Sequence, residues 1–280
     1  MTSSSLASSV AYLGPEGTFA HAVAKSRFGK NHRLLPEPDI RGVFESVLDH
    51  KAGSGIVPLE NSSGSWIYAT IDLLIGHAEK IKITKEHSLD VELAFAGHKN
   101  GTVKRIYSHF APLEHNARWL RSNHPHAEQI SCASTAHAAL KARADEHGAA
   151  ITSRAAATIY GLDVLAFPLG ADEENVTRFM QIALADGKAH HGKKTGLVLA
   201  LKDTPGSLAK FLQPFERANL NLSAIVSRAV HGKPGSHRFF IEVDGSETET
   251  KISSAVEQAE ASAISLVSLG NYSATAKLKG

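Results

Sequence analysis

The sequence predicts an α/β protein in two parts: a long segment of alternating strands and helices, then a smaller βαββαβ unit of the ferredoxin-like type. From about Val10 to Leu184, short apolar runs alternate with segments of helical periodicity, which is typical of sheets with mainly parallel pairing. After Thr195 the order of these runs changes, and a polar, basic stretch precedes the change. These observations together predict two domains.

The first part opens on a strand, VAYLG, which enters a Gly-Pro turn. The next run, TFAHAVAKSRF, has helical spacing, with Phe19, Val23 and Phe28 on one side. Asp39 predicts the start of another helix, because its carboxylate can accept the free N–H groups of a first turn. Further strands are predicted at SGIVPLE, KRIYSH, EQISC, AAITS and VLAFPL, with helices after Phe110, Ser134 and Ser153.

The second part supplies one element after another of a ferredoxin-like unit. In order, we expect strand TGLVLAL, helix DTPGSLAKFLQPFERANL, strand LSAIVSRAV, turn HGKPGSH, strand RFFIEVDG, helix SAVEQAEASA and strand ISLVSLGNYS. The polar stretch ADGKAHHGKKT is predicted to be the linker. The expected boundaries are residues 9–185 for the first domain, 186–193 for the linker and 194–280 for the second domain.

Composition excludes several classes of protein. The net charge of +2 is spread over 280 residues, which does not favour a nucleic-acid partner. No segment is long and apolar enough to span a membrane, and the first ten residues lack the pattern of a signal peptide, so we expect a frayed tail there. The single cysteine, Cys132, fits a reducing, cytoplasmic compartment and is expected to be a small buried residue.

Four polar loops are expected at the ends of predicted strands. They are GPEGTF (14–19), LENSSGS (59–65), STA (134–136) and ENVTRF (174–179). In open α/β sheets, ligands bind outside the carboxyl ends of strands, and the first N–H groups of a following helix attract anions. Because three of these loops lead into helices, the set indicates a small anionic ligand.

Each loop also has a purely structural interpretation. Ser134 with Thr135 can cap a helix, Asn61 can form a turn, and Arg178 can be the partner of an acidic residue. The neighbouring His190 and His191 lack a second pair of metal ligands at fixed spacing, so we expect a solvated linker. Neither a phosphate-binding Walker loop nor a metalloprotease or hydrolase signature is present.

Six motifs in this order resemble the catalytic domain of prephenate dehydratases: AYLGPEGTF, IVPLENSSGS, IYSH, STA, AAITSRAAATIYGL and NVTRF. DTPGSL and IVSRAV resemble the phenylalanine-binding ACT domain that follows it in that family. The resemblance implies a bilobal domain similar to the type-2 periplasmic-binding fold, with the substrate prephenate between the lobes. It also implies no cofactor or metal, an L-phenylalanine effector, and a homodimer or homotetramer.

The implied reaction is the decarboxylating dehydration of prephenate to phenylpyruvate, in phenylalanine biosynthesis. The resemblance gives Thr177 as the catalytic acid and places Glu60 and Asn61 with it in the cleft. The expected substrate-binding residues are Thr18, Ser62, Ser108, His115, Ser134, Thr135 and Arg178. The expected effector-binding residues are Pro205, Gly206, Ser207, Leu208, Ser227 and Arg228.

The chain departs from the family pattern in both parts. Ala111 and His115 stand where the family usually has glutamine, which predicts altered substrate contacts. Val226 and Ala229 stand in the family's ESRP motif, so weak phenylalanine binding or another effector is expected. Two alternatives stay open: an arogenate dehydratase, which recognises an amino-acid side arm, and a non-catalytic sensor of a small anion with the same fold.

Overall fold

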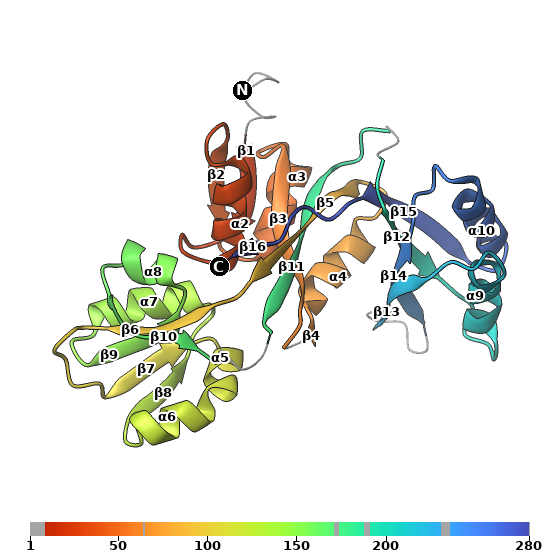
Figure 1. Cartoon of the computed structure of the whole chain (residues 1–280). Coiled ribbons are helices and arrows are strands. Elements are labelled where there is room, and N and C mark those ends of the chain that lie inside the picture. Colours follow the sequence, from red (N-terminus) through yellow and green to blue (C-terminus); the bar gives the residue numbers. More distant parts are fainter. Residues whose placement is uncertain (1–8, 64, 171–173, 188–190, 231–235, 280) are drawn as a thin grey trace.

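The computed structural model describes residues 9–63, 65–170, 174–187, 191–230 and 236–279. Three sheets form three bodies in a row: a second lobe, a first lobe and a ferredoxin-like domain (Figure 1). The frayed tail predicted at the start, the middle of the linker and most of the turn HGKPGSH lie outside the described residues.

The first lobe is built on a sheet with the strand order β16-β5-β11-β3-β1-β2, and β4 pairs with β3. Its strands are β1 (Ser9–Leu13), β2 (Arg33–Glu37), β3 (Ser54–Asn61), β4 (Ser65–Trp66), β5 (Ile81–Asp90), β11 (Val176–Leu184) and β16 (Leu278–Lys279). Its helices are α2 (Phe19–Phe28), α3 (Ile40–Leu48) and α4 (Tyr68–Gly76). Asp39 caps α3 as expected, because its Oδ1 accepts the Gly42 N–H at 2.8 Å.

The second lobe has a sheet with the order β10-β6-β9-β7-β8. Its strands are β6 (Leu93–Gly97), β7 (Arg105–Ser108), β8 (Glu128–Ser131), β9 (Gly148–Thr152) and β10 (Asp163–Leu169). Its helices are α5 (Phe110–His115), α6 (Ala117–Asn123), α7 (Thr135–Ala144) and α8 (Arg154–Ile159). Cys132 is buried here with a free thiol, next to the alanines that pack α7 on the sheet.

Pairing in the two lobes is mixed, and this corrects the expectation of mainly parallel sheets. The strands β1, β2 and β3 pair in parallel, as do β7, β8 and β9. The other neighbours are largely antiparallel: β11 runs against β3 and β5, and β6 runs against β9 and β10. The reason is that the chain leaves the first lobe along β5 and β6 and returns along β10 and β11.

The two lobes are joined at this crossing and also contact each other away from it. At the crossing strands, the Val91 N–H donates to the Asn175 carbonyl at 2.7 Å. Away from the crossing, the Ser153 hydroxyl donates to the carbonyl of Gly17 at 3.0 Å. Gly17 has φ +87°, and a Cβ there would lie 2.9 Å from Ala156, so glycine allows the turn to approach α8 this closely.

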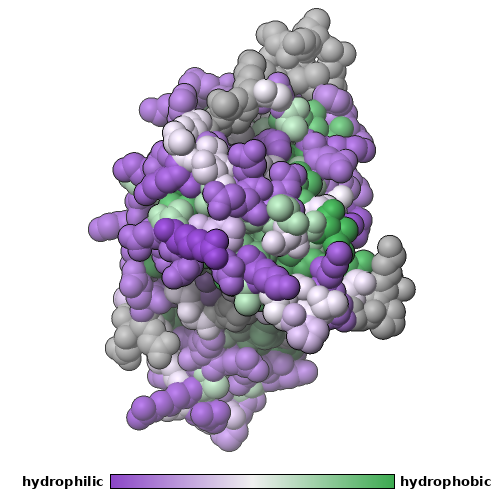
Figure 2. Space-filling view, turned by 90° about the vertical axis from the view of Figure 1, so that its right-hand side faces the viewer, coloured by the Kyte–Doolittle hydropathy of each residue, from purple (hydrophilic) through white to green (hydrophobic). Residues whose placement is uncertain are grey.

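The ferredoxin-like domain has the predicted βαββαβ order, and its sheet runs β13-β14-β12-β15. The elements are β12 (Lys194–Ala200), α9 (Ser207–Arg217), β13 (Leu222–Ala229), β14 (His237–Asp244), α10 (Thr250–Glu260) and β15 (Ser265–Tyr272). The side that carries α9 and α10 is mostly hydrophilic, with hydrophobic residues in small patches (Figure 2). Both helices therefore turn their apolar residues, such as Phe211 and Phe215, toward the sheet.

The opposite face of this sheet packs on the first lobe. Phe240 and Tyr272 of the ferredoxin-like domain belong to the same buried cluster as Ile83 and Met180 of the first lobe. The apolar core is thus continuous across the domain junction, and the sheet is covered on both faces. In the described part of the chain, no helix is long and apolar enough to cross a membrane.

After β15 the chain returns to the first lobe through residues 273–279, which we call the strap (Figure 1). The Thr275 N–H donates to the Glu86 carbonyl at 2.8 Å, and β16 pairs in parallel with β5. Lys277 Nζ lies 2.7 Å from Asp90 and 3.0 Å from Glu174, one on each crossing between the lobes. The ferredoxin-like domain is therefore attached to the first lobe by both the linker and the strap.

Candidate active site

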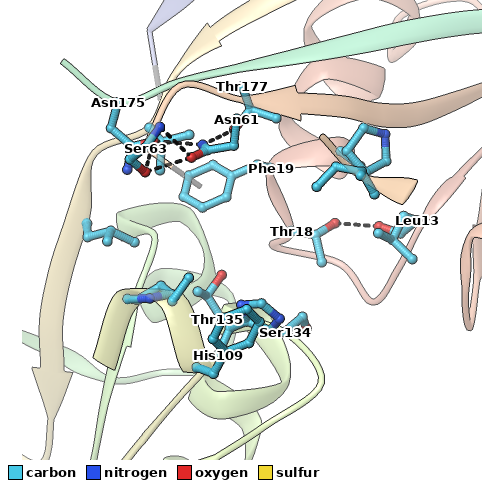
Figure 3. Close-up of a pocket in the computed structure, with 18 of the residues that line it drawn as sticks. Leu13, Thr18, Phe19, Asn61, Ser63, His109, Ser134, Thr135, Asn175 and Thr177 are labelled. Atoms are coloured by element: carbon cyan, nitrogen blue, oxygen red, sulfur yellow. Dashed lines mark hydrogen bonds between the residues drawn. The ribbon is translucent and has the colours of Figure 1, made fainter. Parts of the chain in front are cut away.

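A cavity of about 570 Å³ lies between the two lobes. The first lobe contributes the ends of β3 and β11 and the start of α2, and the second lobe contributes the segments that begin α5 and α7 (Figure 3). Six of the expected site residues line it: Thr18, Asn61, His115, Ser134, Thr135 and Thr177. The fold thus brings together motifs that are far apart in the sequence.

A hydrogen-bond network fixes the hydroxyl group of Thr177. Asn61 Nδ2 donates to Thr177 Oγ1 and to Asn175 Oδ1, both at 2.8 Å (Figure 3). Asn61 Oδ1 accepts from the backbone and the hydroxyl of Ser63, at 3.0 and 2.6 Å, which sets the orientation of the amide. Because Thr177 Oγ1 accepts a hydrogen bond from Asn61, its own proton is left to point elsewhere, and the cavity is beside it.

Thr177 lies within strand β11, which corrects the expectation that ENVTRF is a loop. The register pairs Thr177 with Asn61 of β3 on one side and with Leu89 of β5 on the other. Thr177 is buried, with 8% of its surface exposed. A residue inside a three-strand ladder is held more rigidly than a residue in a loop, and this suits a group that must be placed accurately.

Two helix N-termini face the cavity from different lobes (Figure 3). Thr18 caps α2, accepting the His21 N–H at 3.1 Å while its hydroxyl donates to the Leu13 carbonyl at 2.7 Å. Ser134 caps α7, accepting the His137 N–H at 3.1 Å. The remaining N–H groups of such first turns, together with the helix dipole, favour a carboxylate. The structural interpretation of Ser134 as a cap and its expected role at the site are therefore compatible.

Among the described residues, the cavity lining contains no lysine, arginine, aspartate or glutamate. Its ionisable side chains are His109, His115 and Tyr68. Burial lowers the pKa of His109, which favours its neutral form. His115 is exposed and lines the cavity from the end of α5, and Ala111 lines it one turn earlier. Anion binding at this site must therefore depend mainly on neutral donors.

Aromatic side chains form much of the remaining wall, and sequence reasoning gave them no role in the site. The residues that share this role are Phe19, Trp66, Tyr68, Phe110 and Phe179. Asn175 and Ser63 were missed as well, although both lie in the quoted motifs ENVTRF and LENSSGS. Alternation along a strand would have placed Asn175 on the same face as Thr177. The cavity can hold a ring against this wall while polar groups bind its substituents.

Four of the expected site residues lie outside the cavity lining. Glu60 and Arg178 point to the other face of the sheet, where Arg178 Nη1 donates to Glu60 Oε2 at 2.8 Å. Ser62 joins the end of β3 to the start of β11, because its hydroxyl donates to the Glu174 carbonyl at 3.0 Å and accepts the Val176 N–H at 2.8 Å. Ser108 is fully buried and donates to the carbonyl of Ile151 at 2.8 Å. The structure gives each of these side chains a structural partner.

The expected effector residues lie in the ferredoxin-like domain at two places. Pro205 and Gly206 precede α9, with Gly206 at φ +83° as its N-cap, and Ser207 and Leu208 are the first residues of the helix. Ser227 is exposed, whereas the next residue, Arg228, points to the first lobe and binds Asp72 through two hydrogen bonds of 2.6 and 2.7 Å. The Arg228 guanidinium also lies 4.5 Å from the ring centroid of Tyr68. Ser227 and Arg228 are therefore split between the two faces of β13.

Two family models match the chain. The model described as "Prephenate dehydratase" matches residues 10–186, and the model described as "ACT domain" matches residues 196–261. These matches cover both lobes and most of the ferredoxin-like domain.

Individual proteins show the same similarity. The chain is 34% identical to the bifunctional chorismate mutase/prephenate dehydratase of Aquifex aeolicus, over 94% of this chain and 73% of that protein. It is 30% identical to the prephenate dehydratase of Lactococcus lactis subsp. lactis, over 94% and 96%. A crystal structure of prephenate dehydratase in complex with L-Phe from Arthrobacter aurescens superimposes with a TM-score of 0.86, at 26% identity, over 95% and 90% of the two chains.

Proposed function

This chain belongs to the prephenate dehydratase family, and we propose that it converts prephenate to phenylpyruvate in the cavity between its lobes. The observation that carries the proposal is the 2.8 Å hydrogen bond from Asn61 to Thr177 Oγ1. This bond leaves Thr177 to act as a donor toward the cavity. Hydroxide is a poor leaving group, and its expulsion from the ring requires a donor such as the Thr177 hydroxyl next to the leaving oxygen.

The chemistry needs little else from the protein. The bond between the ring and its carboxylate breaks, and its electron pair enters the ring as CO₂ leaves. The bond from the ring to its hydroxyl oxygen breaks as the ring becomes aromatic, and the leaving oxygen takes up one proton, supplied in net terms by the solvent, to give water. No C–H proton has to be removed, so a base is not needed. Thr177 donates a hydrogen bond to the leaving oxygen, and such a donor contributes about 10²–10⁴-fold.

The substrate's two carboxylates require donors, and the cavity offers neutral ones. The N-termini of α2 and α7, with the hydroxyls of Thr18, Ser134 and Thr135, are placed in both lobes to bind them. The apolar wall that includes Phe19 and Phe179 receives the ring. Binding across the cleft also holds the lobes together around the substrate.

The lining favours a keto acid over an amino acid side arm. Arogenate carries an ammonium group, and no carboxylate side chain is present among the described residues that line the cavity. A buried ammonium without a counter-charge is costly. We therefore propose prephenate as the preferred substrate, with phenylalanine as an effector at the ACT domain.

The direct test is incubation of the purified chain with prephenate and with arogenate, while phenylpyruvate and phenylalanine are quantified. Phenylpyruvate formation at a far higher kcat/KM than phenylalanine formation supports the proposal. Faster turnover of arogenate would support the first alternative, and turnover of neither would leave the small-anion sensor.

We also propose that the protein is a homodimer or homotetramer. β13 is an edge strand of the ferredoxin-like sheet, and Ile225 on it is 44% exposed. An edge strand with an exposed apolar residue is suited to pairing with a second copy. Light scattering of wild type and Ile225→Lys tests this, and an unchanged mass in the variant would exclude β13 as the contact.

A further inference from the structure

Arg178 follows Thr177 on β11, and its side chain lies on the opposite face of the sheet. Its Nη1 donates to Glu60 of β3 at 2.8 Å, and its Nε and Nη2 donate to Glu86 of β5 at 3.2 and 2.8 Å. Its Nη2 also donates to both oxygens of Glu242, at 2.7 and 2.9 Å. Because Glu242 belongs to β14, one guanidinium joins the strand of Thr177 to the ACT domain.

This cluster of charges is buried at the domain junction. The side chain of Arg178 is 18% exposed, that of Glu86 6% and that of Glu242 0%. Lys194 Nζ lies 3.2 Å from Glu86, and the Tyr272 hydroxyl donates to Glu242. Burial acts to lower the pKa of Arg178, but hydrogen bonds and charges from Glu86 and Glu242 raise it, so the guanidinium stays charged. A buried ion whose partner is removed cannot regain its hydration unless the surrounding structure moves.

The register of β11 couples this cluster to the active site. Thr177 stands opposite Asn61 on β3, and Arg178 stands opposite Glu60. One pair faces the cavity and the other faces the ACT domain. A shift of β11 that changes the ion pairs of Arg178 therefore also changes the distance from Thr177 to Asn61.

All three nitrogen atoms of the Arg178 guanidinium take part in this arrangement. Its Nε, Nη1 and Nη2 each donate to a carboxylate, and Arg178 is absent from the cavity lining. A guanidinium held by carboxylates from three strands sets the relative position of those strands more strictly than a single pair does. Arg178 therefore acts on Thr177 through the position of β11 and not through contact with the substrate.

We propose that Arg178 is a positioning residue for Thr177 and that Glu242 makes this positioning depend on the ACT domain. The inference rests on the proposed function, because it assigns the effect of Arg178 to the dehydration step. β14 can occupy more than one position relative to the first lobe, and an effector that binds one position more tightly shifts the equilibrium toward it. The free energy of this shift cannot exceed the difference between the effector's affinities for the two positions. The Arg178 carboxylate cluster is the point at which the shift reaches Thr177.

The test is Glu242→Gln, which removes one charge at a fully buried position outside the cavity while keeping the size of the side chain. We expect kcat to fall about tenfold or more while KM changes less than about threefold, because Thr177 acts mainly in the transition state. Phenylalanine should still bind in calorimetry, but its effect on kcat/KM should shrink at least about fivefold.

A control breaks an ion pair far from the domain junction. Arg105→Gln removes the pair with Asp145 in the second lobe, where the two side chains lie 2.5 Å apart, and should leave kcat within about twofold. Amide hydrogen exchange at Thr177 to Phe179 gives a readout that does not need turnover, and it should be faster in Glu242→Gln than in the control.

The outcomes separate this inference from the proposed function. If the wild type does not convert prephenate, the proposed function fails, and exchange at these amides alone decides the positioning role. If Glu242→Gln does not fold, Tyr272→Phe removes only the hydroxyl that donates to Glu242, and kcat should fall about threefold. Normal kcat with normal exchange, or a loss no larger than that of Arg105→Gln, would overturn the inference.

Discussion

Replacing Asn61 with aspartate is expected to reverse the hydrogen bond that orients Thr177. In the wild type, Asn61 Nδ2 donates to Thr177 Oγ1 at 2.8 Å. In Asn61→Asp a carboxylate oxygen takes the place of that nitrogen and can only accept. The Thr177 proton then turns toward residue 61 and away from the cavity, with almost no change in side-chain volume.

The magnitude follows from the bond that is lost. A hydrogen bond to an oxygen that gains charge is worth about 1.5–3 kcal/mol. Each 1.36 kcal/mol changes a rate about tenfold, so kcat should fall about 10- to 150-fold. Asn61→Ala removes the donor without offering an acceptor, so Thr177 can still donate, and a loss of about 0.5–1.5 kcal/mol, or roughly 2- to 13-fold, is expected.

Steady-state formation of phenylpyruvate measures both variants, and their melting temperatures show whether either is misfolded. The kcat of Asn61→Asp should also recover as the pH is lowered, because a protonated carboxyl can donate to Thr177 again. The reasoning is refuted if folded Asn61→Asp turns over as fast as Asn61→Ala, since the direction of the hydrogen bond would then not matter.

Three further results are expected. Thr177→Val should lower kcat at least about 10²-fold with little change in KM, and Thr177→Ser should keep most of the rate; near-normal turnover in Thr177→Val would remove its hydroxyl from the mechanism. Gly206→Val, at φ +83°, should weaken phenylalanine binding in calorimetry by about 1–2 kcal/mol. Gly187→Val, at φ +69° and likewise with no atom within 4 Å of a Cβ, should leave phenylalanine binding unchanged. If both variants bind phenylalanine equally well, the effector site lies elsewhere. Burial lowers the pKa of His87 from 6.5 to about 4. As the pH falls, the unfolded chain therefore takes up a proton at His87 before the folded chain does. About 3 kcal/mol of stability should therefore be lost between pH 6.5 and 4, and urea unfolding of His87→Gln should show a flatter pH dependence than wild type.

Sequence periodicity located the elements that have one solvent-exposed face and one buried face. The helix capped by Asp39 and the whole ferredoxin-like unit are of this kind, and both are confirmed. Helix α4 was missed because it is apolar nearly all round, with Ile71 and Leu74 fully buried between the first lobe and the ACT domain. Strand β5 was missed for the opposite reason, since it carries charged residues such as Glu86 whose partners lie far away in the sequence.

The sequence motifs predicted which segments form the site, but they did not predict the direction in which each side chain points. Thr177 and Arg178 are adjacent in NVTRF, yet one lines the cavity and the other faces the ACT domain. Only the pairing of β11 with β3 and β5 decides which is which. Val226, which departs from the family's ESRP motif, also has a side-chain direction that only the structure reveals. It is buried in the core shared by the first lobe and the ACT domain.

The strap has a consequence for any attempt to study the catalytic lobes alone. A fragment that stops at the predicted boundary near residue 185 loses β16, and the outer edge of β5 is left with unpaired backbone groups. It also exposes Ile83 and Met180, which the ACT domain covers in the full chain. Open strand edges and bare apolar patches promote aggregation. Such a fragment would fail first by precipitating, so co-expression with residues 194–280 as a separate chain is the better way to divide this protein.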